Sequence, residues 1–187
     1  MTISLVPTTA FAVEQGEADV ASRAELKAAL DNAEVSTINI TSDIDMGTEY
    51  WVPVTIERDL TINGRGNSIQ NMKVNTGILK PSGSGIAGDG GSCDYYAGFI
   101  GNNKAKLTIN DLSFSSAVVD INPVTINETS TGSSILAVVC ANNVGTLVYN
   151  NVKVDASEVK GYTKVGILHG FSQNSGTFVA NQCAVTN

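Results

Sequence analysis

From about residue 37 onward, the chain alternates apolar and polar residues with a period of two. The clearest early runs are residues 37–41, 52–56 and 59–62, and each ends near Gly, Asn or Asp. Successive side chains of a strand point to opposite faces of a sheet, so this pattern predicts short strands with one buried face. Similar runs, separated by turn-forming residues, continue to Asn187.

A helical pattern precedes these strands. Ser22 and Glu25 form a capping box, in which the serine accepts from the backbone N–H of residue 25 and the glutamate reaches back to the start of the helix. Leu26, Ala29 and Leu30 follow at helical spacing, with charged residues on the other face. We predict a helix that ends at about Asn32 and lies as a lid over one end of the strand stack.

An eight-residue phrase recurs in the second half of the chain. An apolar pair alternates along a strand, an Asn interrupts it, and a second apolar pair resumes; the copies are residues 107–114, 147–154 and 178–185, with a looser copy at 60–64. Asn tolerates left-handed backbone conformations, and its amide both donates and accepts, so Asn side chains of successive coils can stack as a ladder. We predict structural corners at Asn63, Asn110, Asn150 and Asn181.

Repeats of strand, corner and strand predict a solenoid whose core is shared between neighbouring coils. A β-sandwich would also show short alternating strands, but nothing in it requires an Asn at one phase of the alternation. We therefore predict an all-β fold, a right-handed parallel β-helix with a short N-terminal capping α-helix. The expected division is a truncated signal peptide over 1–12, an N-terminal segment with the capping helix over 13–34, and β-helix coils over 35–187 that continue beyond this sequence.

A second apolar phrase, bounded by small residues, precedes each corner at residues 97–103, 137–143 and 165–171. Together with residues 175–178 and 181–185, its last copy resembles the GLUG-type repeat of bacterial surface proteins. The second copy departs from that pattern, because Val138 and Ala141 stand where glycine is expected.

The earlier segments 51–56 and 59–69 are similar to the first coils of pectate-lyase-like β-helices in secreted adhesin-like proteins. Both resemblances together cover about residues 20–187. They imply a parallel β-helix and a bacterial secreted or cell-surface protein, and they say little about activity, because the motif residues form turns and core.

Composition narrows the range of partners. Charged residues make up only 16% of the chain, the net charge is -7 and the pI is about 4.5. No basic stripe is present that could displace counterions from phosphates, so nucleic acid is excluded as a partner.

The first twelve residues predict export. An apolar run that includes Leu5 and Val6 is broken by Pro7 and followed by Ala10-Phe11-Ala12, a small-x-small pattern typical of signal peptidase sites. No other apolar segment reaches the ~20 residues that a membrane-spanning helix needs, so no membrane insertion is expected within this chain.

Few residues suggest metal or nucleophile chemistry. Cys93, Cys140 and Cys183 match no zinc spacing, and we interpret Cys140 and Cys183 as small core residues. The single histidine, His169, excludes a multi-histidine metal site and is interpreted as a polar residue on one face of a coil. We expect no metal and no cofactor.

Two carboxylates could act together. Asp43 and Asp45 flank Ile44 and would project from one strand as an acid pair or a cation site. β-Helices that cleave polysaccharides place two or three acids on one sheet face, so this pair is the candidate for catalysis. The alternative, which we favour, is that both face solvent on an edge coil beside Gly47.

Residues 82–96 are predicted to form a long loop, and such loops often carry binding function. Asp94, Tyr95 and Tyr96 are residue types that stack on sugars and hydrogen-bond to them, which makes them the candidate ligand-binding residues. The alternative is an insertion whose tyrosines pack back onto the coil. Asp89 and Asp94 are too few acids for a known calcium site.

The leading functional hypothesis is a non-enzymatic surface scaffold that acts in adhesion or glycan binding, with a glycan or host surface as its partner and further β-helix repeats in the full-length chain. One alternative is a fragment of a polysaccharide lyase or glycoside hydrolase with a β-helix fold. Another is a structural stalk.

Overall fold

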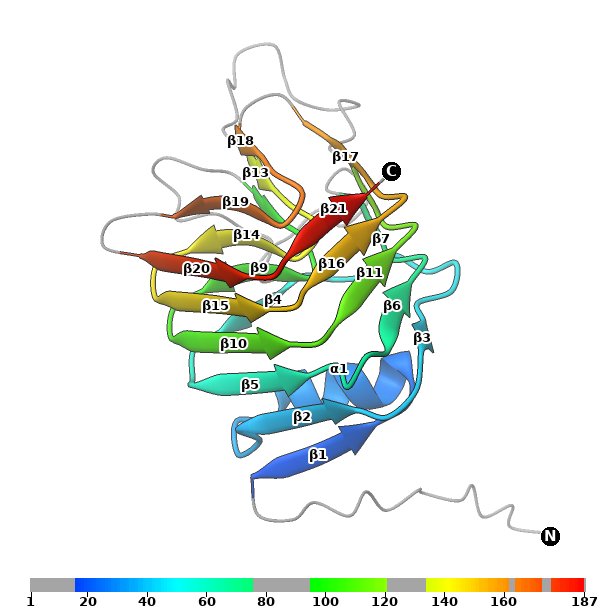
Figure 1. Cartoon of the computed structure of the whole chain (residues 1–187), viewed down its shortest axis with the longest axis vertical. Helices are drawn as coiled ribbons and strands as arrows, with labels where there is room; N and C mark the ends of the chain where they lie inside the picture. Colours follow the sequence, from blue (N-terminus) through cyan, green and yellow to red (C-terminus); the bar gives the residue numbers. More distant parts are fainter. Residues whose placement is uncertain (1–15, 76–94, 121–133, 162–163, 173–175, 187) are drawn as a thin grey trace, which may run out of the picture.

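The computed structural model describes residues 16–75, 95–120, 134–161, 164–172 and 176–186. Strand pairs among these residues are parallel and in register, and they form five sheets that run along one axis (Figure 1). The chain climbs this axis in a right-handed sense, and from β2 onward consecutive described strands lie in different sheets. The prediction of an all-β parallel β-helix is therefore confirmed.

Three sheets form the longer walls of the coil. The six-stranded sheet has the order β1-β2-β5-β10-β15-β20, with strands Glu17–Val20, Thr37–Ile40, Leu60–Asn63, Lys106–Asn110, Thr146–Asn150 and Thr177–Asn181. The five-stranded sheet has the order β3-β6-β11-β16-β21, with strands Ile44–Asp45, Ser68–Gln70, Ser113–Ser115, Lys153–Asp155 and Ala184–Thr186. The four-stranded sheet has the order β4-β9-β14-β19, with strands Val54–Ile56, Ile100–Asn103, Cys140–Asn143 and His169–Ser172.

Two three-stranded sheets complete the circuit. One has the order β7-β12-β17, with strands Lys73–Asn75, Val118–Asp120 and Glu158–Lys160; the other has the order β8-β13-β18, with strands Tyr95–Ala97, Ser134–Leu136 and Lys164–Val165. Equivalent asparagines of successive coils lie 47, 40 and 31 residues apart. Most of this difference falls between the two three-stranded sheets, where residues 76–94, 121–133 and 162–163 lie outside the described part of the chain.

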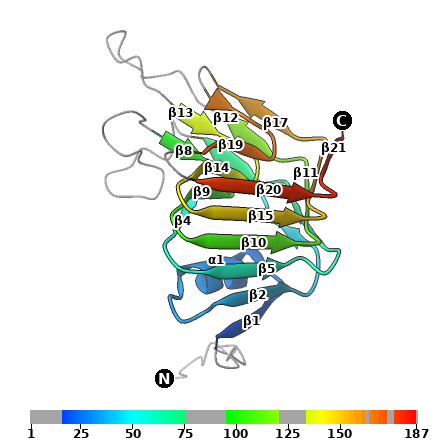
Figure 2. The same cartoon turned by 60° about the vertical axis from the view of Figure 1, so that its left-hand side comes forward.

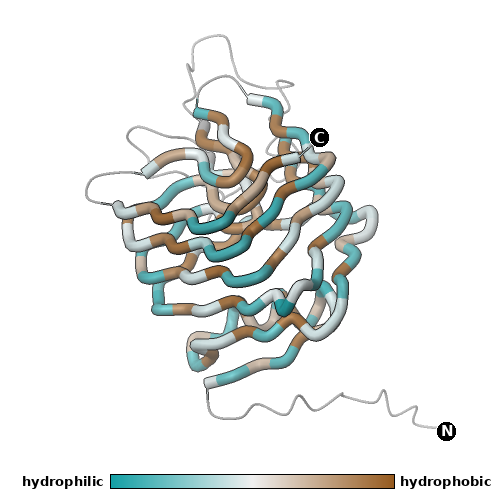
Figure 3. Tube along the Cα trace, viewed as in Figure 1, coloured by the Kyte–Doolittle hydropathy of each residue, from teal (hydrophilic) through white to brown (hydrophobic). Residues whose placement is uncertain are grey.

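Inward-facing positions of successive coils form one shared core. In strands such as β10 and β15, alternate side chains are apolar and buried in this core. Figure 3 shows alternating hydropathy along the trace as brown segments between paler or teal ones. Three aromatic rings pack together inside the core: the Trp51 ring stacks on Phe99 with centroids 5.6 Å apart, and the Phe114 ring is tilted against Phe99 at 5.4 Å. The Trp51 indole also donates to the carbonyl of Phe99 at 2.9 Å, so its one polar group is paired inside the core.

The chain leaves the six-stranded sheet through a corner with a left-handed residue. Asp111, Asn151 and Gln182 have φ values of 49°, 54° and 55°. Each follows a predicted corner asparagine, which is itself the last residue of its strand. The prediction that the asparagine adopts the left-handed conformation is wrong, because the amide stays in the sheet register and the bend falls one residue later.

The corner after β5 differs from the later ones. Gly64 follows Asn63, and a Cβ there would lie 2.3 Å from the carbonyl oxygen of Asp111 in the next coil, so only glycine fits this approach. The left-handed residues are displaced to Arg65 and Gly66, with φ values of 54° and 83°. This longer corner explains why residues 60–64 looked like a loose copy of the repeat.

Helix α1 spans Arg23–Asp31, which confirms the predicted helix. Ser22 accepts from the backbone N–H of Glu25 at 3.3 Å, and the Glu25 carboxylate accepts from the N–H of Ala21 at 2.7 Å, one residue earlier than a standard capping box. Its apolar face contacts β1, β2 and β4. The helix therefore covers the interior at the N-terminal end.

Arg58 closes the other end of α1. Its guanidinium donates to the carbonyls of Val35, Leu30 and Ala29 at 2.6, 3.2 and 3.1 Å. The last carbonyls of a helix lack partners within the helix and carry partial negative charge, so a cation there satisfies both needs. This contact ties α1 to the segment between β4 and β5.

The first strand lies before the helix and was not predicted. β1 pairs in register with β2, from Glu17 opposite Thr37 to Val20 opposite Ile40. The six-stranded sheet therefore begins within the segment that the sequence analysis assigned to the N-terminal cap. Glu17, Ala18, Asp19 and Val20 do alternate polar and apolar residues, but the run is too short to stand out without the pairing.

The corner between β16 and β17 provides a test of backbone strain. Ala156 has a φ of 43° there. At this left-handed position, the Cβ of alanine lowers the stability of the folded state by about 1–2 kcal/mol. Glycine avoids that strain, but its greater entropy in the unfolded chain lowers stability by about 0.5–1 kcal/mol. We expect Ala156→Gly to raise the free energy of unfolding by about 0.5–1 kcal/mol, measured by urea denaturation. Ala117→Gly, at a buried position without positive φ, should lower it; a loss of stability in both variants would contradict the strain argument.

Candidate functional site

The outward face of the six-stranded sheet presents two straight columns of side chains. In-register pairing aligns one column of Asp19, Asn39, Asn63, Asn110, Asn150 and Asn181, and a second of Thr37, Thr61, Thr108, Val148 and Val179. Figure 2 shows this sheet from the front, with no other described element covering it. Neighbouring strands of a sheet lie about 4.8 Å apart, so each column repeats a chemical group at that interval.

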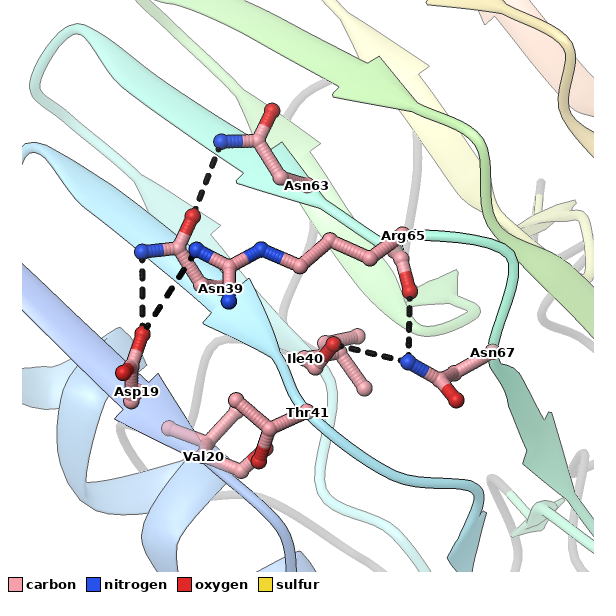
Figure 4. Close-up of polar contacts among 9 residues, drawn as sticks. Asp19, Val20, Asn39, Ile40, Thr41, Asn63, Arg65 and Asn67 are labelled. Carbon is pink, nitrogen blue, oxygen red and sulfur yellow. Dashed lines mark hydrogen bonds and ion pairs between the residues drawn. The ribbon is translucent and has the colours of Figure 1, made fainter.

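The first column is a continuous hydrogen-bonded ladder. Asn181 donates to Asn150 at 2.8 Å, Asn150 to Asn110 at 2.8 Å, and Asn110 to Asn63 at 2.9 Å. Asn63 then donates to Asn39, and Asn39 to Asp19, both at 3.0 Å; Figure 4 shows this lower part. Each bond in a sheltered stack contributes on the order of 1 kcal/mol net. The four asparagines predicted as corners thus lie in one ladder.

The ladder has a direction. Every amide donates its Nδ2–H toward the N-terminal end, and the amides of Asn39, Asn63, Asn110 and Asn150 each accept on Oδ1 from the coil above. Asp19 ends the series, because an ionised carboxylate accepts and has no proton to pass on. Nη2 of Arg65 lies 3.9 Å from Oδ1 of Asp19 (Figure 4), which balances part of that charge at an exposed position.

The second column gives the face a different chemistry. Its threonines present a hydroxyl and a methyl group, and Val148 and Val179 present methyl groups only. Glu17, the register partner of Thr37, continues this column at the N-terminal end and is charged. The two columns together form a strip with hydrogen-bonding groups along one side and small apolar groups along the other. We refer to the two columns together as the ladder face.

The predicted loop site is only partly within the described residues. Asp94 lies outside them, as does the side chain of Tyr95. Strand β8 begins at Tyr95, so the loop assignment of Tyr95 and Tyr96 is wrong. The Tyr96 side chain is 2% exposed and packs with Ile135 and Ala141 in a small cluster of its own, because alternation in β8 puts Tyr96 and the core residue Ala97 on opposite faces. A ligand-binding role for Asp94 and Tyr95 stays a prediction.

Asp43 and Asp45 are each engaged by the next coil. Oδ1 of Asp43 accepts from the backbone N–H and the hydroxyl of Ser68 at 2.7 and 2.9 Å. Oδ1 of Asp45 accepts from the N–H of Gly47 at 2.9 Å and from Asn71 at 3.1 Å. The bond from Gly47, and then that from Asn71, lowers the pKa of Asp45. These ionised acids hold neighbouring coils together, which supports the structural interpretation of the pair.

His169 lies on β19 and connects three coils. Its Nδ1 is 3.1 Å from the Cys140 carbonyl oxygen, which can only accept, so the neutral ring carries its proton on Nδ1. Nε2 then accepts from the Ser172 hydroxyl at 2.9 Å. The Phe178 ring of the following coil packs 4.7 Å from the imidazole. A serine bonded to an imidazole can be a nucleophile with its base, but this half-buried ring packs between the Cys140 carbonyl and the Phe178 ring of neighbouring coils.

The cysteines agree with a packing role where they are described. Cys140 is buried, and burial raises the pKa of its thiol well above the usual value. Cys183 is partly buried against the core, and neither forms a disulfide; Cys93 lies outside the described residues. In the described part of the chain, no three His, Cys, Asp or Glu side chains gather as metal ligands. Its helix is also too short and polar to cross a membrane.

A groove of about 490 Å³ lies between α1 and residues 52–58. Its volume is in the usual range of ligand sites, and Leu30 and Pro53 give it an apolar part. Its charged side chains, however, already have partners within the fold: Lys27 bonds to Asp31, Glu57 bonds to Lys104, and Arg58 caps the helix. We therefore take the ladder face, whose polar groups recur and face outward, as the candidate functional site.

Sequence reasoning missed two members of the ladder. Asn39 follows Thr37 and Ile38 as Asn63 follows Thr61 and Ile62, so the shared Thr-Ile-Asn phrase could have identified it. Asp19 gave no such indication, because its strand is separated from the next one by α1.

Comparison with known families gave one match. The family described as "Putative pectate lyase-like adhesive domain" matches residues 17–169 of the chain. The match therefore begins at the first residue of β1 and reaches β19. The comparisons with curated proteins and with solved structures gave no match. The resemblance to GLUG repeats stays a prediction.

The ladder can be interrupted at its middle. Asn110→Leu removes the donor to Asn63 and the acceptor of Asn150, and leaves two partly sheltered amide groups unpaired. We expect a loss of about 2–3 kcal/mol in the free energy of unfolding, measured by chemical denaturation. Thr108→Leu, on the same face of the same strand but outside the ladder, is the control and should change stability by less than about 1 kcal/mol. Equal losses in both variants would show that the ladder is not what stabilises this face.

His169 predicts a pH dependence. Burial lowers the pKa of its imidazole below the usual 6.5, opposed in part by the hydrogen bond to Cys140. The folded state therefore favours the neutral ring, and the stabilisation is complete above pH 6.5 and is lost as the pH falls toward the folded-state pKa. We expect the melting temperature of the wild-type chain to fall more steeply below pH 6.5 than that of His169→Gln. Parallel profiles would contradict this.

Proposed function

Because the chain belongs to the pectate lyase-like adhesive domain family, we propose that it is a non-enzymatic adhesive scaffold of an exported bacterial protein and that it holds a surface glycan on the ladder face. The observation that carries the proposal is the two-column strip on the outward face of the six-stranded sheet. The family description supports adhesion, and the ladder face supplies a surface on which adhesion can occur.

The chemistry of the strip matches that of a neutral sugar chain. Sugar hydroxyls both donate and accept, as do asparagine amides and threonine hydroxyls. The less polar faces of pyranose rings present C–H groups, which the threonine methyls and Val148 can contact. Since the chain carries a net charge of -7, a neutral glycan fits better than an acidic one.

Rigidity supports the same assignment. The ladder amides from Asn39 to Asn150 are already fixed by bonds to the coils above and below, so binding costs little further side-chain entropy. The columns also repeat their groups at the strand spacing of about 4.8 Å, so a linear polymer can make the same contact several times. Many weak, equivalent contacts are a suitable basis for adhesion.

The alternative of polysaccharide cleavage requires acids that meet at one bond. The pair considered from the sequence, Asp43 and Asp45, instead accepts from separate donors of the fold. These contacts favour binding over cleavage. A structural stalk remains the other alternative, and the experiment below separates all three.

The proposal is tested on an array of neutral plant and host glycans. We expect the wild-type chain to bind at least one glycan, and the double variant Thr108→Gln with Val148→Gln to bind it at least tenfold more weakly, because longer side chains interrupt the strip without changing the net charge. Ser113→Gln, on the outward face of the five-stranded sheet, is the control and should bind like the wild type. Absence of binding would favour the stalk, and release of new reducing or unsaturated ends would favour an enzyme.

A further inference from the structure

The ladder face has two parts that differ in charge. On its N-terminal side, charged side chains lie in or beside the two columns: Glu17, Asp19, Asp59, Arg65 and Lys106. On β15 and β20, by contrast, no residue is charged, and the outward side chains are Thr146, Val148, Asn150, Thr177, Val179 and Asn181. We refer to these outward residues of β15 and β20 as the uncharged half. It suits an uncharged group of a ligand, because it contains no charge to pair with an ionic one.

Valine takes the place of threonine within the uncharged half. Val148 and Val179 are register partners and continue the threonine column of the lower coils, and Val179 is 40% exposed. Both side chains point away from the coil axis, so pairing of further strands along the axis does not cover them. A sugar hydroxyl placed on these methyl groups loses water without gaining a hydrogen bond, whereas a hydroxyl placed on a threonine finds a partner. The uncharged half therefore favours a ligand that brings a methyl group to this position.

An amide group lies beside these methyl groups. Asn150 is two residues after Val148, and therefore on the same face of β15. Its ladder bonds use one N–H, which it donates to Asn110, and one lone pair, which accepts from Asn181. An asparagine side chain has two N–H groups and two lone pairs on its oxygen, so Asn150 keeps one of each for a ligand. Methyl groups and a hydrogen-bonding amide thus stand next to each other in one row.

We propose that the uncharged half is a subsite for acetamido groups, so that the glycan held on the ladder face carries N-acetylated sugars; this inference rests on the proposed function. An acetamido group is uncharged and combines a methyl group with an amide. Its methyl group lies on Val148 and Val179, and its amide bonds to Asn150. The hydroxyl groups of the same glycan then lie over the lower part of the face, where Thr61 and Thr108 can bond to them. The two valines are the residues that determine specificity.

The experiment compares two neutral probes, oligosaccharides of equal length derived from chitin and from cellulose. The two differ at one position of each sugar ring, where the chitin probe has an acetamido group and the cellulose probe a hydroxyl. Affinities for the full chain are measured by titration calorimetry. We expect the chitin probe to bind about tenfold more tightly or better, the lower end of what one apolar group contributes to discrimination. Saturation-transfer NMR should give the strongest signal at the acetyl methyl group.

Two variants of the chain locate the preference. Val148→Thr combined with Val179→Thr gives these two positions the hydroxyls of the lower coils and leaves the net charge unchanged. We expect this double variant to bind the two probes with affinities within about twofold of each other, with most of the change in the chitin probe. Val118→Thr makes the same kind of change on β12, in another sheet, and should keep the preference of the wild type.

The outcomes separate this inference from the proposed function. Equal affinity of the wild-type chain for the two probes, or a preference that survives in the double variant, would overturn the acetamido subsite and leave glycan binding intact. Failure of both probes, together with binding of another neutral glycan on the array, would also overturn the subsite alone. Absence of binding to every glycan would overturn the proposed function, and the subsite with it.

Discussion

In-register parallel pairing between successive coils is the constraint on which the rest of the structure depends. No single coil encloses a core, because each inward side chain is covered mainly by its equivalents one coil away. Ile69, Phe114 and Val154 illustrate this, since in-register pairing aligns these buried residues although they lie far apart in sequence. A shift of one residue would exchange inward and outward positions, so the register is fixed by burial first and by side-chain bonds second.

The ladder gives the stack of coils a direction, because each of its hydrogen bonds runs from one coil to the coil on its N-terminal side. An asparagine can pass a hydrogen bond from one coil to the next because it has both a donor and an acceptor, whereas an ionised aspartate, which only accepts, ends the series. The direction follows from the starting point at Asp19, which accepts from Asn39 and has no proton to donate. The two ends of the stack consequently differ in chemistry even though the coils between them are alike.

Most of the fold could be predicted from the sequence because it is repetitive. The phase of Asn110, Asn150 and Asn181 within alternating strands, together with the capping box at Ser22, indicated the β-helix and its helix, and the structure confirms both. The features that could not be predicted are local or do not repeat along the chain. The left-handed residue at each corner, such as Asp111, is not distinguished by type from its neighbour. β1 pairs with β2 across a helix, and Tyr96 is a buried strand residue where a loop was expected.

The candidate site was harder to predict for a physical reason. Sequence reasoning searched for uncommon groups, such as paired acids, a histidine and tyrosines in a loop, because catalysis and tight small-ligand binding depend on such groups. The ladder face is built from common residues whose significance comes only from alignment, as with Thr61, Thr108 and Val148 in one column. A surface of this kind works by repetition. The ordinary turn and strand residues of a solenoid can therefore hold the coils together and, on their outward side, form a binding face at no further structural cost.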